Sequence, residues 1–272
     1  MVYRFVLALL LGVSGSLHAT KPDPAPALQF LTEHSPPGEY LDENGELAGV
    51  TFELLRSISE QLNENVHFEL MPWARAFAIA TTELNTALFE TTRTPSREPL
   101  FQWVGPLKIH RIALYARKDR FNVAVPPAYW PQHYIACEYI QSVYLDKLNE
   151  LGFNEEHNLF QTVQHGDCFN LLLRGRVDII LLSETSAALR AQEVEELGIE
   201  LVQLNGFIET RQYLAFSRDV PVERVARWQQ ALLQSYRDGR MRALYHSVYP
   251  EEMITALEQV ALEQLLLLQN PD

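Results

Sequence analysis

Segments with the apolar pattern of β-strands alternate with segments with the pattern of α-helices along most of this chain. In the first part, the helical segment at 49–63 carries Leu54, Ile58 and Leu62 on one face. Strands that alternate with helices form parallel sheets, so the pattern predicts an α/β protein. The elements expected here are strands at 27–32, 66–70 and 86–90 and helices at 49–63 and 72–83.

A second run of the same kind follows. The elements expected in it are strands at 134–137, 158–163, 177–182 and 199–204 and helices at 139–153, 167–176 and 183–198. Two alternating strands, at 108–119 and 209–219, lead out of the two runs. If both strands cross between lobes, the first lobe is discontinuous. The predicted domains are then lobe one at 27–115 plus 210–250 and lobe two at 116–209.

The tail at 251–272 has its own helical pattern, with Ile254, Leu257 and Ala261 at helical spacing. This predicts a C-terminal helix. Packing on lobe one is the favoured interpretation, and an exposed docking helix is the alternative.

Composition and motifs exclude several functions. A formal charge of −13 over 272 residues argues against nucleic-acid binding, because phosphate backbones select basic surfaces. The sequence contains no dinucleotide-binding, P-loop, nucleophile-elbow or zincin pattern. We therefore expect no cofactor, no metal site and no catalytic residues.

The N-terminus has the features of a secretory signal peptide. One early positive charge, Arg4, precedes an apolar run from Phe5 to Val13, and small residues follow up to Ala19. The apolar run is short for a membrane span, so a retained anchor is the less favoured alternative. Residues 1–19 are predicted to be removed on export.

We predict that the exported protein begins at Thr20. Mass spectrometry of the protein isolated from its native host should find this residue at the N-terminus. A full-length product retained in the cytoplasm would contradict export.

The chain has two cysteines, Cys137 and Cys168. An even number in an exported protein suggests a disulfide. Each follows a strand-like run, and neighbouring parallel strands would bring those ends together. We predict a Cys137–Cys168 disulfide in lobe two, with two buried free thiols as the alternative.

One stretch, "TTRTPSREPLFQWVGPL" at 91–107, combines two arginines with hydroxyl side chains. It occurs in order with "ENGELAGVTFELL", "MPWARAFAIA", "LLRGRVDIILL" and "YLAFSRD". This series resembles the bacterial family-3 extracellular solute-binding proteins, the periplasmic receptors of polar amino-acid ABC importers, over nearly the whole mature chain. The resemblance implies a type II periplasmic-binding-protein fold, with two α/β lobes and two crossover strands as the hinge.

The resemblance also assigns ligand-binding roles. Arg97 matches the arginine of a T-x-x-R segment that binds the α-carboxylate of the ligand, and a guanidinium is suited to two parallel hydrogen bonds to a carboxylate. Thr92 and Ser142 match positions that make further contacts to the ligand carboxylate. Ser142 is expected at the start of a lobe-two helix. Tyr40 matches an aromatic residue that stacks on the ligand, with a core position as the alternative.

Two positions depart from the family pattern. Ser183 stands where the family often has a carboxylate for the ammonium group of the ligand, and Glu90 replaces a serine. Ammonium recognition could fall to Glu184 or Glu90, or the ligand could lack an α-amino group. Trp73 could line the cleft or belong to a buried helix face.

The leading hypothesis is a non-enzymatic, monomeric periplasmic protein that captures a small carboxylate solute, an amino acid above all, by hinge closure. The resemblance implies delivery to a membrane ABC permease. One alternative is a dehydratase-like enzyme on the same fold, with Glu90 and Glu184 as acid and base. The other is a ligand-sensing module for a membrane partner.

Overall fold

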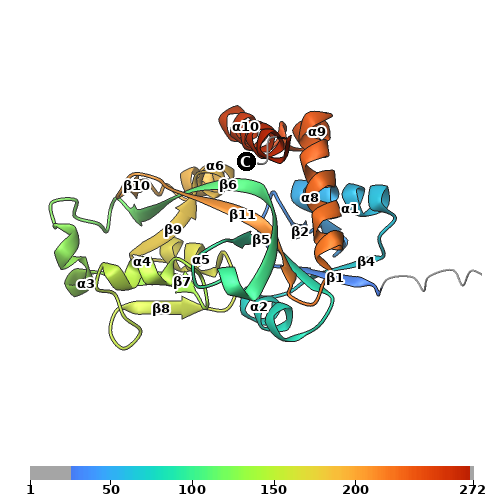
Figure 1. Ribbon diagram of the computed structural model, residues 1–272. Helices are drawn as coiled ribbons and strands as arrows, with labels where there is room; N and C mark the ends of the chain where they lie inside the picture. The colour runs from blue at the N-terminus through green and yellow to red at the C-terminus, as the bar shows by residue number, and fades with distance from the viewer. Residues whose placement is uncertain (1–25, 270–272) are drawn as a thin grey trace, which may run out of the picture.

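A computed structural model describes residues 26–269 of the chain. The predicted signal peptide lies outside this range. The described chain forms two lobes that lie side by side, with β-strands in the middle of each and helices on the outside (Figure 1).

The first lobe is built from both ends of the described chain. Its strands and helices are β1 (Leu28–Thr32), β2 (Tyr40–Leu41), β3 (Leu47–Ala48), α1 (Val50–Leu62), β4 (Val66–Leu70), α2 (Trp73–Thr82), β5 (Thr86–Thr92), the 3-10 helix η1 (Glu98–Leu100), α8 (Val222–Arg237), α9 (Arg240–Tyr245) and α10 (Glu251–Gln269). Strand β1 pairs in parallel with both β4 and β5.

The second lobe is built from the middle of the chain. Its elements are the 3-10 helix η2 (Pro127–Tyr129), α3 (Trp130–His133), β7 (Ala136–Tyr139), α4 (Leu145–Glu150), β8 (Leu159–Thr162), α5 (Asp167–Leu173), β9 (Ile179–Ser183), α6 (Glu184–Leu189), α7 (Ala191–Glu196) and β10 (Leu201–Gln203). Strand β7 pairs in parallel with both β8 and β9.

Two long antiparallel strands, β6 (Phe101–Arg117) and β11 (Ile208–Ser217), connect the lobes (Figure 1). In the first lobe β11 pairs with β5, and in the second lobe β6 pairs with β9 and β10. Apart from the separate β2–β3 hairpin, the described strands of both lobes therefore belong to one continuous sheet, in the order β4-β1-β5-β11-β6-β9-β7-β8, with β10 beside β6. The predicted α/β fold with two crossover strands is confirmed.

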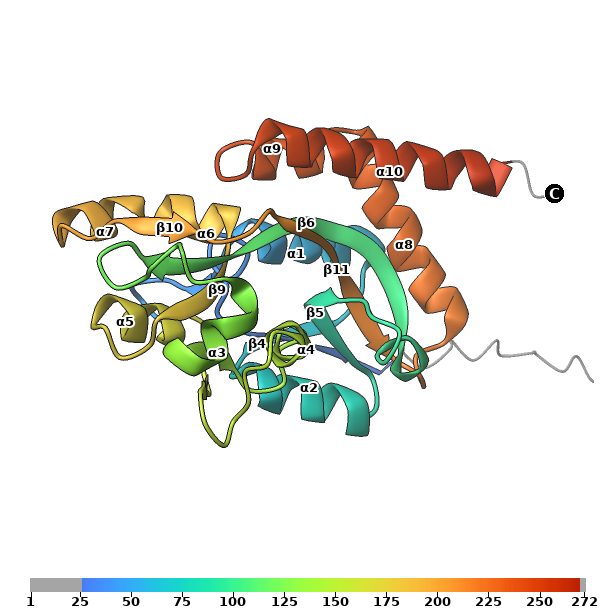
Figure 2. The ribbon, with the colours of Figure 1, turned by 90° about the vertical axis from the view of Figure 1, so that its left-hand side faces the viewer.

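Each lobe has apolar cores on both faces of its sheet. In the first lobe the larger core is closed by helices from both ends of the chain, with Trp228 of α8 fully buried and Leu54 of α1 beside it. Helix α10 contributes Ile254, Leu257 and Ala261 to this core and lies across β6 and α8 (Figure 2). Burial of such side chains contributes about 1.5–3 kcal/mol each, so α10 is an integral part of the first lobe.

The sequence predictions differ from the structure mainly at element ends. The strand expected at 108–119 starts earlier, at Phe101. The helix expected at 183–198 is divided at Arg190 into α6 and α7. The helix expected at 139–153 is wrong over its first half, because residues up to 144 form the end of β7 and a turn, and α4 is only six residues long.

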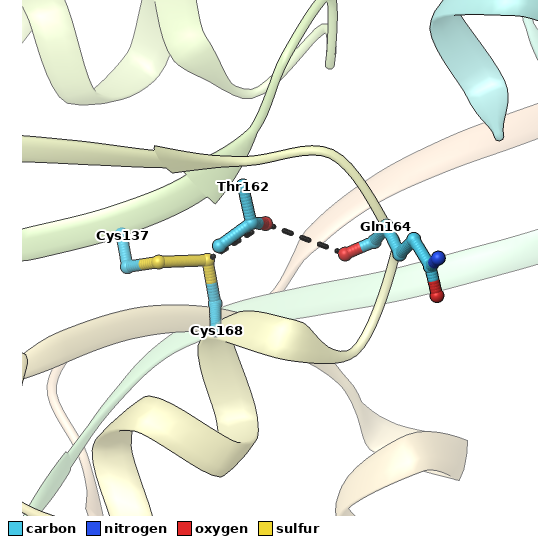
Figure 3. The surroundings of a disulfide bond; sticks show 4 residues. All are labelled: Cys137, Thr162, Gln164 and Cys168. Carbon is cyan, nitrogen blue, oxygen red and sulfur yellow. Dashed lines mark hydrogen bonds between the residues drawn. A yellow bond between two sulfur atoms is a disulfide. The ribbon is translucent and has the colours of Figure 1, made fainter.

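The predicted Cys137–Cys168 disulfide is present and joins β7 to the first turn of α5 (Figure 3). The Cα atoms are 5.5 Å apart. Beside it, the Thr162 hydroxyl lies 3.6 Å from the Cys168 sulfur and donates to the carbonyl of Gln164. The bridge therefore ties the start of α5 to the central strand of the second lobe.

We predict that replacing both cysteines by alanine lowers stability by about 2–4 kcal/mol, because the bridge closes a loop with a sequence separation of 31 residues. Thermal melting with and without a reductant is the measurement. The reductant should lower the melting temperature of the wild type and leave that of the double variant unchanged. An unchanged wild-type melting temperature under full reduction would count against a stabilising bridge.

Candidate functional site

A cavity of about 340 Å³ lies between the two lobes. The parallel strands of both lobes end at it: the lining includes Glu33 after β1, Thr92 at the end of β5, Tyr139 at the end of β7, and Ser183 at the end of β9. In α/β proteins ligands bind at the carboxyl ends of parallel strands. The volume is at the lower end of the range for small-molecule sites, which suits a ligand of amino-acid size.

Arg97 lines this cavity, and its side chain is only 7% exposed. Nη1 donates to the carbonyl of Thr92 at 3.3 Å, and Nη2 donates to the carbonyl of Gln141 at 3.1 Å. The guanidinium carbon lies 5.0 Å from the ring centres of both Trp73 and Phe77. These contacts orient the guanidinium. They do not use all of its five N–H groups, so the remaining N–H groups can donate to a further acceptor.

Arg97 has no carboxylate partner among residues 26–269. The neighbouring Glu98 is paired instead with Arg93, at 2.6 Å, on the surface. Arg93 is 42% exposed and also lies over the rings of Trp103 and Tyr213. The two arginines of the segment therefore have different roles. Arg93 belongs to a surface ion pair, whereas Arg97 is a buried cation at the cavity.

The backbone carbonyl of Gln141 joins the two lobes. It accepts hydrogen bonds from Arg97 and from Nε1 of Trp73, at 3.1 Å each. Gln141 has a φ of 60°, in the left-handed region that non-glycine residues rarely adopt. The turn after β7 that contains this residue thus places its carbonyl within hydrogen-bond distance of two donors of the first lobe.

Glu90 faces the cavity from an irregularity in β5. The pairing of β5 with β11 shifts between Tyr213 and Ala215, and Glu90 itself has a φ of 54°. The bulge re-aims the side chain, which forms a buried ion pair with Lys108 of β6 and accepts a hydrogen bond of 2.6 Å from Thr51. The charge of Glu90 is therefore already balanced within the first lobe.

Two other carboxyl groups line the cavity, Glu33 and Glu138. Glu138 is 5% exposed, and burial raises the pKa of this carboxyl to about 8. Burial likewise raises the pKa of Glu33 to about 8, with a smaller opposing contribution from its hydrogen bond with Tyr139. Both side chains therefore carry a proton at neutral pH in the ligand-free protein.

The histidines at the cavity are neutral for the converse reason. Burial lowers the pKa of His165 to about 4, and the positive charges of Lys108 and Arg190 lower it further. Burial and Lys108 also hold the pKa of His110 well below its usual value. Above about pH 6 these rings are uncharged polar groups, so the charge of Arg97 is not opposed by them.

Five of the residues expected at the site line the cavity: Arg97, Thr92, Trp73, Glu90 and Ser183. The described lining residues do not include the other three, Tyr40, Ser142 and Glu184.

The structure gives each of these three another environment. Tyr40 pairs with Ala48 in the short β2–β3 hairpin. Glu184 is partly exposed and forms an ion pair with Arg111. Ser142 is buried beside the cavity, but α4 begins only at Leu145, and the Ser142 hydroxyl accepts a hydrogen bond from the backbone of Tyr144. The expected helix N-terminus at Ser142 is therefore wrong.

Several cavity residues were not singled out from the sequence. The most important are Glu33, Lys108, Glu138 and Tyr139. A signal for Glu33 was available, because it directly follows a predicted strand that ends at residue 32. The same signal was available for Glu138, which directly follows the strand expected at 134–137 and belongs to β7 in the structure.

Family comparison agrees with this geometry. The model of the bacterial extracellular solute-binding proteins, family 3, matches residues 28–250. The chain belongs to this family. No curated protein sequence matches it.

Solved structures share the fold of this family-3 protein at low sequence identity. The sensor domain of a histidine kinase, described as similar to periplasmic binding proteins, is 23% identical, with 82% of this chain and 95% of that chain covered and a TM-score of 0.69. An ancestral arginine-binding protein bound to arginine is 18% identical, with 82% and 98% covered and a TM-score of 0.71. An arginine transport system periplasmic binding protein from Legionella pneumophila is 16% identical, with 82% and 99% covered and a TM-score of 0.69.

Two further features of the described residues bear on the site. Within this range, no group of three or more histidine, cysteine and acidic side chains is arranged to hold a metal ion. Between residues 26 and 269, no helix combines the length and apolar character needed to cross a membrane.

The proton held by Glu138 leads to a testable pH dependence. A carboxyl whose pKa is raised by folding stabilises the protein below its unfolded pKa, and this contribution is lost as the pH rises through about 8. We predict that the melting temperature of the wild type, relative to that of Glu138→Gln, falls between pH 6 and pH 8.5. In this range the neutral histidines contribute little, because their pKa values are lowered.

Thermal melts of the ligand-free proteins across this pH range provide the measurement. Glu252→Gln, which removes an exposed acid, serves as the control and should follow the wild type. Parallel curves for the wild type and Glu138→Gln would show that Glu138 is ionised in the folded protein.

Proposed function

We propose that this family-3 protein is an exported, monomeric, non-enzymatic receptor that captures a small carboxylate solute of amino-acid size between its lobes. The observation that carries the proposal is the buried guanidinium of Arg97, which lines the cavity and has no carboxylate partner among residues 26–269. A ligand carboxylate supplies the missing countercharge and accepts the remaining N–H donors.

The surroundings of Arg97 support a carboxylate over other acceptors. The rings of Trp73 and Phe77 hold the guanidinium plane in place, which favours two parallel hydrogen bonds to a planar anion. Thr92 adds a hydroxyl group to the same part of the cavity. A carboxylate bound here is shielded from water by both lobes, which strengthens its attraction to Arg97.

The Gln141 carbonyl supports a mechanism of hinge closure. Its bonds from Arg97 and Trp73 form only when the lobes are close together, so the closed form assembles one end of the binding site. A ligand that binds this form more tightly than the open form shifts the population toward closure. Bending of β6 and β11 is the movement that the connections between the lobes allow.

The proposed partner is the membrane permease of an ABC importer, reached in the periplasm after removal of residues 1–19. A transport role is stated for the structurally similar arginine protein from Legionella pneumophila. A sensory role is the second candidate, favoured by the likeness to a histidine kinase sensor domain. In both roles the closed, ligand-bound form is the one that the partner recognises.

An enzymatic role has less support. Another similar structure is an ancestral amino acid-binding protein described as a precursor of cyclohexadienyl dehydratase. In this chain, however, Glu90 is committed to Lys108, and Glu184 pairs with Arg111 and is not among the described cavity residues. The proposed acid–base pair of a dehydratase-like reaction is therefore not assembled.

We predict that Arg97→Ala and Arg97→Lys each lose most of the affinity for the ligand. A thermal-shift screen of the standard L-amino acids and of small carboxylic acids would identify the ligand, because binding to the folded state raises the melting temperature. Breaking a buried charged pair costs roughly 2–5 kcal/mol, or about a thirtyfold loss of affinity or more. Calorimetric titration would measure it.

Arg93→Ala is the matched control, because it removes an arginine from the same segment that is exposed and paired with Glu98. Its affinity should stay within about threefold of the wild type. Wild-type affinity in Arg97→Ala would refute the carboxylate assignment. Recovery of a chemically altered ligand after incubation would refute the non-enzymatic role.

A further inference from the structure

The disulfide of the second lobe belongs to the wall of the cavity. Cys168 is half-buried and lines the cavity together with residues 164–166, which come shortly before it. Cys137 is fully buried, and the two residues that follow it in β7, Glu138 and Tyr139, also line the cavity. The bridge therefore joins two segments that both contribute to the binding site.

The segment that follows Cys137 meets the first lobe. It continues into the turn whose Gln141 carbonyl accepts hydrogen bonds from Arg97 and from Trp73. The segment that precedes Cys168 forms another part of the wall, because Thr162 and residues 164–166 line the cavity. The disulfide fixes the position of one segment relative to the other.

Few other contacts hold the second segment against β7. The β7–β8 ladder ends where Tyr139 pairs with Thr162, and the backbone of Ile140 donates to the Thr162 carbonyl at 2.9 Å. Beyond this point the hydrogen bonds are short-range. The carbonyl of Gln164 accepts at 3.3 Å from the Thr162 hydroxyl and at 3.3 Å from the backbone of Asp167 (Figure 3). The bridge is the covalent tie at the far end of this segment.

We propose that the Cys137–Cys168 disulfide is a redox switch of ligand binding: the oxidised protein binds its small carboxylate solute tightly, and the reduced protein binds it weakly. The inference rests on the proposed function and adds regulation to the same site. Without the bridge, residues 163–167 gain conformational freedom, which must be lost again when the lobes close on a ligand. Fixing the backbone of even one or two residues on binding lowers the affinity by about tenfold or more.

The reductant in this proposal is a dithiol, which supplies two electrons. One of its thiolates attacks Sγ of Cys168, breaks the S–S bond and releases the thiolate of Cys137, which takes up a proton. The second thiolate of the reductant then attacks the reductant's own sulfur in the mixed disulfide. This releases the thiolate of Cys168, which also takes up a proton. The products are two cysteine thiols and the disulfide of the reductant.

The position of the bridge couples its reduction to ligand binding. Attack takes place at Cys168, because Cys137 is fully buried. Since Cys168 lies at the cavity, closure of the lobes over a solute restricts the access of a reductant. The coupling is also reciprocal at equilibrium: the factor by which reduction weakens binding is the factor by which the bound solute disfavours reduction. A tenfold factor lowers the midpoint potential of the bridge by about 30 mV.

Hydrogen exchange of the ligand-free protein tests the structural part of the proposal. The oxidised wild type is compared with the same protein reduced by dithiothreitol. Reduction should accelerate exchange of the amides at 138–144 and 162–169, which form the wall, and leave strand β1 of the first lobe unchanged. Unchanged exchange at 162–169, or an equal acceleration in β1, would show that the bridge does not order the wall locally.

Calorimetric titration tests the effect on binding. The probe is the tightest binder in the thermal-shift screen of the standard L-amino acids and small carboxylic acids. Reduced wild type should bind it about tenfold or more weakly than oxidised wild type. The double variant Cys137→Ala/Cys168→Ala should bind as weakly as the reduced protein, with or without dithiothreitol. Thermal melting confirms that each form is folded at the temperature of the titration.

Phe121→Leu is the matched control for stability. Phe121 is buried in a core of the second lobe that does not include the cysteines, so its truncation destabilises this lobe and leaves the cavity wall intact. Its oxidised form should bind the probe as the oxidised wild type does. If it loses affinity as the reduced protein does, the effect comes from general destabilisation and the switch is refuted.

The rate of reduction provides an independent measurement. Saturating probe should slow the reduction of the wild type by dithiothreitol at least severalfold. Arg97→Ala, which is expected not to bind the probe, should be reduced at the same rate with and without it. Equal rates for the wild type with and without bound probe would contradict the proposed coupling.

Failure of this inference can be distinguished from failure of the proposed function. If oxidised and reduced wild type bind the probe equally, and Arg97→Ala binds it in neither state, the carboxylate site stands and the redox switch is refuted. If no screened compound binds the oxidised protein, both proposals fail.

Discussion

The burial of one guanidinium between the lobes determines how the site is built. Arg97 keeps its charge away from water, so its N–H groups need acceptors close by, and the protein provides a carbonyl from each lobe. Carbonyl groups satisfy hydrogen bonds without cancelling the charge. The protein thus holds a cation that is well oriented and electrically uncompensated, and it does so only when Gln141 of the second lobe lies close to it.

The remaining charges around the cavity are arranged so that they do not neutralise Arg97. Glu90 is balanced by Lys108, while Glu33 and Glu138 hold protons because burial raises their pKa values. The histidines are neutral because burial lowers theirs. The acids at this cavity are therefore neutral or paired at neutral pH: desolvation keeps Glu33 and Glu138 protonated, and Lys108 balances Glu90.

Much of the fold follows from sequence patterns, because periodicity reports directly on which side chains are buried. Alternation predicted the α/β class and the two crossover strands, and the T-x-x-R resemblance located Arg97. The segment at 139–144 misled the prediction because its apolar spacing also fits a helix, whereas the left-handed Gln141 ends the strand in a turn. The ion-pair partners of Glu90 and Glu184 could not be predicted in this way. They are Lys108 and Arg111 of β6, which are distant in the sequence and are brought close by the arrangement of strands in the sheet.

The continuous sheet has a mechanical consequence. Both lobes are attached to the same pair of hydrogen-bonded strands, β6 and β11, so neither lobe can translate away from the other without breaking that ladder. What remains soft is bending and twisting of a two-stranded ribbon, whose pairing is already irregular between Gln212 and Leu214. Contacts between the lobes that lie far from this ribbon therefore have the greatest leverage on the angle between the lobes.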